Sequence, residues 1–91
     1  METFRNNEKD KLFFKNYQSV DENSIFQEAK IILEKDEQIN FTKYQEAIWL
    51  DTWYGLLNNV KFELSLDINY GAMVLCTDEK TLAELEVILN S

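Results

Sequence analysis

A strict alternation of apolar and polar residues runs from Val60 to Tyr70, in the stretch VKFELSLDINY. A period of two that holds over so many residues predicts a β-strand with one buried face and one solvent-exposed face. The apolar run AMVLCT follows Gly71 and lacks this alternation, which is typical of a strand covered on both faces. The two segments together predict an antiparallel hairpin.

Apolar residues at helical spacing predict three helices elsewhere in the chain. The first covers about residues 22–36 and the second about residues 43–57. The third begins after a capping residue, Thr77 or Asp78, and carries one stripe of leucine and isoleucine. The second segment is apolar nearly all round, which is typical of a central, buried helix.

The N-terminal region is less clearly patterned. Residues 8–17 fit either a short helix or an edge strand, residues 11–20 could supply a third strand, and residues 1–7 are expected to be frayed. The sequence therefore predicts an α+β fold. We expect a small single domain over residues 1–91, in which an antiparallel hairpin or three-stranded sheet packs against three helices.

The charge of the chain restricts its partners. Seventeen acidic residues and nine basic residues give a formal charge of −8. This sign disfavours binding to nucleic acid and to anionic membranes, both of which attract lysine and arginine. The chain has no apolar run long enough to span a membrane, and its charged N-terminus is unlike a signal peptide. We therefore expect a cytoplasmic protein.

The residue types needed for most catalytic and metal sites are scarce. The chain has no histidine, and its single cysteine, Cys76, lies in an apolar run where it is expected to be a buried hydrophobe. Gly55 and Gly71 are too far apart to build a phosphate-binding loop. Glu63 and Asp67 share a strand face, but a separation of about 13–14 Å is too long for a catalytic carboxylate pair. We expect no enzyme activity, cofactor or metal site.

Two tryptophans stand in the second predicted helix, Trp49 and Trp53. Either both are core residues, or at least one is exposed and belongs to a protein-binding surface, where tryptophan is enriched. An acidic surface is suited to a basic partner, because opposite charges steer association. The predicted partner-binding residues come from this helix and from the polar face of the strand: Trp49, Asp51, Trp53, Glu63 and Asp67.

In size and charge, the chain resembles immunity proteins and antitoxins, which neutralise bacterial nucleases and other toxins. The triplet Trp53-Tyr54-Gly55 is similar to the aromatic-Tyr-Gly start of a helix in barstar-like ribonuclease inhibitors. The likeness covers three residues, and here the glycine stands late in a predicted helix. The resemblance implies a non-catalytic inhibitor and assigns no residue a role.

The leading hypothesis is therefore an immunity protein or antitoxin that neutralises a basic bacterial toxin, most concretely a nuclease. The alternative is a phage-encoded inhibitor or DNA mimic that blocks a host defence or DNA-binding protein. Lysines interrupt the acidic residues along the chain, which disfavours the mimic. The strand at residues 60–70 could also bind a partner strand if it lay at an edge of the sheet, whereas neighbours on both sides would prevent this.

Overall fold

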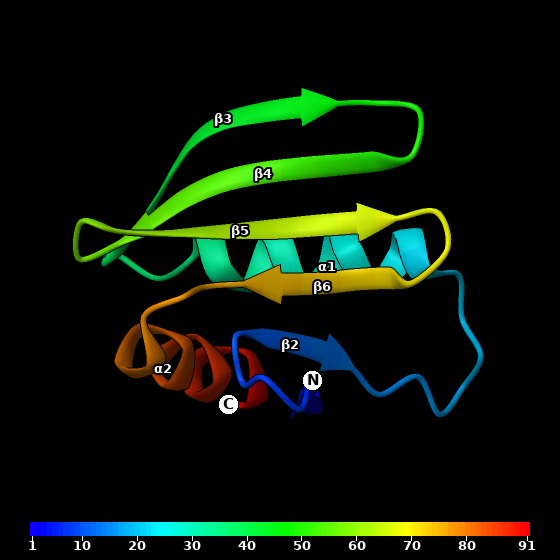
Figure 1. Cartoon of the computed structure of the whole chain (residues 1–91), viewed down its shortest axis with the longest axis horizontal. Helices are drawn as coiled ribbons and strands as arrows, with labels where there is room; N and C mark the ends of the chain where they lie inside the picture. The colour runs from blue at the N-terminus through cyan, green and yellow to red at the C-terminus, as the bar shows by residue number, and fades with distance from the viewer.

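Six antiparallel strands form one sheet, and two helices pack on one of its faces (Figure 1). The structure is a computed structural model that describes all residues from 1 to 91. The strands are β1 (Thr3–Arg5), β2 (Lys11–Phe14), β3 (Ile39–Glu46), β4 (Leu50–Leu57), β5 (Val60–Asp67) and β6 (Gly71–Leu75), and the helices are α1 (Glu22–Glu34) and α2 (Glu79–Asn90). The spatial order is β1-β2-β6-β5-β4-β3. Neither helix is long and apolar enough to cross a membrane.

The predicted architecture of three helices and at most three strands is wrong, because the segment at residues 43–57 is not a helix. It forms most of β3, a short loop and β4. Both faces of β4 carry apolar or aromatic side chains, with Trp53 and Leu57 on one face and Tyr54 and Leu56 on the other. A strand of this kind shows no period of two and reads as an element that is apolar all round.

The N-terminal region adds two strands to the sheet. β2 pairs with β6, and β1 pairs with β2, so β2 is an internal strand. The strand left open for residues 11–20 therefore exists over Lys11–Phe14, although it does not pair with β5. Residues 3–5, within the segment expected to be frayed, form β1.

The predicted hairpin of β5 and β6 is confirmed, with Leu64 opposite Val74 and Asp67 opposite Gly71. The other side of β5 pairs with β4 along its full length. Because both sides of β5 are occupied, a partner strand cannot add to it. The free edges of the sheet belong to β1 and β3.

The hydrophobic core lies between the two helices and one face of the sheet. The alternating strand β5 contributes Phe62 and Leu64, which are buried against α1 and α2 side chains. The opposite face of β5 carries its polar residues and has no helix over it. The fully buried residues of the core come from both layers: Leu12, Ala29, Leu33, Leu64, Val74, Leu82, Leu85 and Leu89.

An aspartate caps the N-terminus of each helix, and Asp78 is one of the two capping residues predicted for the C-terminal helix. Asp21 accepts a hydrogen bond from the backbone N–H of Asn23, at 3.2 Å, at the start of α1. Asp78 accepts hydrogen bonds from the backbone N–H and the hydroxyl of Thr81 at the start of α2. These bonds lower the pKa of Asp78, because they favour its charged form.

A carboxylate ties the first turn of α1 to the sheet. One oxygen of Glu22, Oε1, accepts the backbone N–H of Ala72 at 3.0 Å, and the other, Oε2, accepts Nδ2 of Asn16 at 2.9 Å. Gly71 precedes Ala72 with a φ of +81°, in the left-handed region that favours glycine. A Cβ at Gly71 would also overlap the Glu22 carboxylate. The absence of a side chain at Gly71 therefore lets α1 dock on β6.

We predict that Gly71→Ala lowers the free energy of unfolding by about 1–3 kcal/mol, because it combines an unfavourable φ with the overlap at Glu22. Urea denaturation followed by circular dichroism measures the change. In a Glu22→Ala background the cost of Gly71→Ala should shrink, since only the backbone strain remains. A Gly71→Ala protein as stable as the original would contradict this account.

Candidate protein-binding surface

Three connections meet at one end of the sheet, on the right of Figure 1. They are the β2–α1 loop, the β3–β4 loop and the β5–β6 turn. The backbone N–H of Ile68 donates to the carbonyl of Trp49 at 3.0 Å, which joins the last two connections. The Glu22 contacts to Asn16 and Ala72 join the first to the turn. We call this surface the loop end and define it as residues 16–22, 46–51 and 67–70.

Exposed apolar side chains are concentrated at the loop end. Seven of the eleven exposed large hydrophobic residues belong to it: Tyr17, Val20, Ile48, Trp49, Leu50, Ile68 and Tyr70. Ile48 is 83% exposed and Trp49 66% exposed, so neither contributes to the core. A concentration of exposed apolar side chains on one end of a small protein is typical of an interaction site.

The loop end also holds unpaired negative charge. It contains five carboxylates, Asp21, Glu22, Glu46, Asp51 and Asp67, and no lysine or arginine. None of the five salt bridges of the protein uses one of these carboxylates. Partial burial, together with the charges of Asp51 and Glu46, raises the pKa of the neighbouring Tyr44. The loop end therefore combines exposed apolar side chains with acidic groups that form no salt bridge.

Local hydrogen bonds hold the loop end in one shape. Oδ1 of Asp67 accepts the backbone N–H groups of Asn69 at 2.7 Å and Tyr70 at 3.1 Å, which fixes the β5–β6 turn. The N–H of Ala47 donates to the carbonyl of Leu50 at 3.1 Å, which closes the β3–β4 loop. A surface ordered before binding loses less conformational entropy when a partner docks.

The structure brings together three of the five predicted partner-binding residues. Trp49, Asp51 and Asp67 all belong to the loop end, where Leu50 pairs with Asp67 across neighbouring strands. Glu63 lies on the same strand face as Asp67 but four residues away along β5, near the middle of the sheet. The predicted set is thus split between the loop end and the uncovered face.

Trp53 lies on the opposite face from Glu63 and serves the packing of β3, β4 and α1. Its ring contacts Tyr44, with centroids 4.8 Å apart, and Phe41, with centroids 5.8 Å apart. The ammonium of Lys30, from α1, lies 4.1 Å from the Trp53 centroid and 4.9 Å from that of Phe41. This cation–π contact holds the far strands of the sheet to the helix layer.

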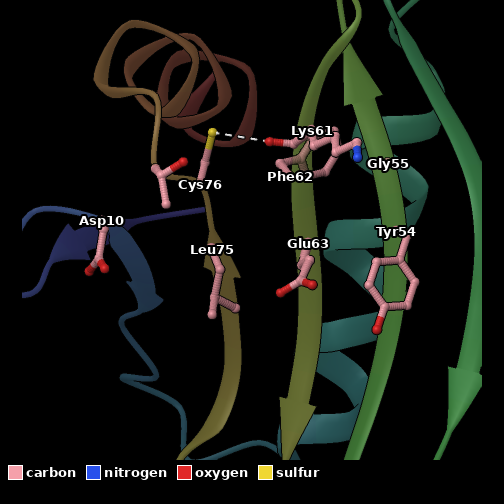
Figure 2. A pocket seen from close by; sticks show the side chains of 9 residues that line it. Asp10, Tyr54, Gly55, Lys61, Phe62, Glu63, Leu75 and Cys76 are labelled. Atoms are coloured by element: carbon pink, nitrogen blue, oxygen red, sulfur yellow. Dashed lines mark hydrogen bonds between the residues drawn. The ribbon is translucent and has the colours of Figure 1, made fainter.

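The uncovered face carries a groove of about 530 Å³ (Figure 2). Tyr54, Glu63 and Leu75 form its walls, and Gly55 and Phe62 lie at its base. Cys76 borders the groove and donates its thiol to the carbonyl of Lys61 at 3.5 Å. Burial raises the pKa of the Cys76 thiol, which disfavours the reactive thiolate. No group of three or more potential metal ligands is present.

Six apolar loop-end residues were missed by sequence reasoning: Tyr17, Val20, Ile48, Leu50, Ile68 and Tyr70. Two of them, Ile68 and Tyr70, continue the alternation of β5 and were counted on its buried face, although β5 ends at Asp67. The turn signal at Asn69 and Gly71 was the available clue, because a turn ends the strand and connecting segments run over the protein surface. No protein-family model, curated protein or solved structure matches the chain.

Truncation of the two tryptophans should change the stability of the protein by very different amounts. We predict that Trp49→Ala changes the free energy of unfolding by less than about 0.5 kcal/mol, as is usual for a surface residue. Trp53→Ala should cost about 2–4 kcal/mol, because it removes the ring that Phe41, Tyr44 and Lys30 contact. Urea titrations of both variants measure the difference. Equal costs would contradict the assignment of Trp49 to the surface.

Proposed function

We propose that the protein is a non-catalytic inhibitor that binds a basic protein through the loop end. The most concrete form of this function is an immunity protein or antitoxin that neutralises a cognate bacterial toxin, such as a nuclease, in the cytoplasm. The observation that carries the proposal is the coincidence of most of the exposed apolar side chains with five unpaired carboxylates on the same connections.

Charge supports a basic partner. Asp21, Glu22 and Asp67 already accept backbone N–H groups, so Glu46 and Asp51, which form no salt bridge, are the carboxylates most available to lysine and arginine of another protein. Their field also accelerates encounter with a positively charged surface, and this acceleration weakens as salt is added. A nuclease meets this description, because its substrate-binding surface must attract phosphates.

The apolar centre supports protein binding over imitation of DNA. Binding energy at interfaces is concentrated in a few buried anchors, among which tryptophan and tyrosine are enriched. Trp49 and Tyr70 are exposed at the loop end, on loops that are fixed by hydrogen bonds. A DNA mimic needs carboxylates in extended rows at phosphate spacing, whereas these carboxylates lie on three separate connections together with exposed apolar side chains.

The decisive experiment uses the protein encoded beside the gene for this chain, since immunity and toxin genes are normally adjacent. The neighbouring protein is expressed with and without this chain, growth is scored, and the affinity of the purified pair is measured at 50 mM and 500 mM salt. We expect rescue of growth and nanomolar binding that weakens as salt rises. Trp49→Ala should weaken binding about 100-fold without unfolding the protein.

A matched pair of glutamate variants tests the electrostatic component. Glu46→Gln removes a charge from the loop end, whereas Glu37→Gln removes an equal charge just beyond the end of α1, at the opposite end of β3. We expect only Glu46→Gln to slow association. Affinity that is indifferent to salt, or to Trp49→Ala, would overturn the proposed surface. If non-specific duplex DNA competed with this chain for binding to several unrelated DNA-binding proteins, the result would favour the DNA mimic instead.

A further inference from the structure

The face of the sheet opposite the helices is uncovered and carries several apolar side chains. Phe4 and Phe13 stack there with centroids 5.7 Å apart, and Phe4 is 46% exposed. The strand registers place further apolar residues on the same face: Met73 and Leu75 on β6, and Leu50, Tyr54 and Leu56 on β4. No segment of the chain covers this face, since both helices belong to the core on the other side.

The charges on this face are ordered along the strands. Lys61 lies at the β4–β5 turn. Lys11 on β2 and Lys43 on β3 lie in the row of the sheet that contains Glu63, two residues along β5 from Lys61. Asp67 lies at the opposite end of β5, about 20 Å from Lys61 by strand rise. This distance exceeds the Debye length of about 8–10 Å at physiological salt, so the two ends act as separate charges. Three lysines are matched on this face by three carboxylates, Glu63, Asp67 and Asp10, and Asp10 forms a salt bridge with Lys11 at 3.4 Å. The face is therefore far less acidic than the rest of the protein.

Two copies can stack face to face about a two-fold axis that is either parallel or perpendicular to the strands. Only one of these axes brings the lysine end of one copy onto the aspartate end of the other. An axis parallel to the strands places Lys61 of one copy near Lys61 of the other. An axis perpendicular to the strands, between the rows of Glu63 and Ser65, places Lys61 opposite Asp67 of the second copy. The same operation places Leu75 opposite Met73 and Leu56 opposite Leu50, two contacts between apolar residues, and it places Lys11 opposite Phe13.

We propose that the uncovered face binds a second copy of this chain, in an antiparallel sandwich of two sheets. The sheets stack about 10 Å apart with strands aligned within about 30°, the usual geometry of packed sheets. The two-fold axis is perpendicular to the strands, and the two symmetry-related pairs of Lys61 and Asp67 fix the direction of stacking. The groove beside Leu75 and Tyr54 is covered in this arrangement by Met73 and Thr52 of the second copy, which lie opposite those two residues.

Sedimentation equilibrium of the purified protein tests this inference without any partner, so it stands or falls separately from the proposed function. We expect a reversible monomer–dimer equilibrium between about 1 µM and 500 µM, the weak range expected of a partly polar interface. Leu75→Gln, which places an amide in the apolar contact, should weaken the dimer about tenfold. Circular dichroism of each variant verifies that it is folded.

A charge cycle tests the direction of stacking. Lys61→Glu places two carboxylates opposite each other and should weaken the dimer about fivefold at low salt. The penalty should shrink in an Asp67→Asn background, where the asparagine Oδ1 can still accept the turn hydrogen bonds. Lys80→Glu, the same charge change on the helix side, should have no such effect.

Three results would overturn the inference. The first is a protein that remains monomeric at 500 µM. The second is a dimer that tolerates both Leu75→Gln and Lys61→Glu, which would assign self-association to another surface such as the edge of β3. The third is an equal effect of Lys61→Glu in the presence and absence of the Asp67 charge, which would exclude the antiparallel stacking.

Discussion

The packing of both helices on a single face of the sheet determines which side chains reach the solvent. Alternate residues of β2, β6, β5 and β4 enter the core on that face, with Leu64 and Val74 at its centre. The side chains between them must therefore point to the other face, whatever their polarity. Thr52 and Ser65 share a hydrogen bond there at 3.2 Å and are shielded by their larger neighbours. Burial on one face thus leaves a second, mixed face for other uses.

The sequence predicts those elements in which one physical signal dominates. The period of two in β5, the helical stripes of α1 and α2, and the aspartate caps are local signals, and each element forms where it is expected. β3 and β4 could not be recognised in the same way, because their identity depends on tertiary pairing. Trp53 lies on the helix side of the sheet and Tyr54 on the other side, and both are aromatic. The alternation of apolar and polar residues that marks a strand is therefore absent from this segment. Aromatic residues in this segment favour a strand, whereas the helical spacing of its apolar residues predicts a helix.

The candidate site could be predicted only in part for the same reason. Trp49 and Asp51 were selected as residues of a helix, yet they lie in and just after a loop between two strands. Asp67 was selected from a different element and lies close to them because the register of β4 with β5 places Leu50 opposite it. The residue types therefore indicated which side chains could bind a partner, and the pairing of β4 with β5 places these side chains close together. Trp53 shows the limit of this approach, since the ring itself does not reveal which face of a strand it occupies.

The loop end and the uncovered face are adjoining surfaces, and this adjacency has a thermodynamic consequence. Leu50 and Asp67 belong to both, since their side chains lie on the uncovered face at its loop end. A partner bound over these residues and a second copy stacked on them would exclude each other. If the partner binds at nanomolar concentration and the dimer dissociates in the micromolar range, the partner displaces the second copy by mass action. Self-association would then cover the apolar face only while no partner is present, at a small cost to the apparent affinity for that partner.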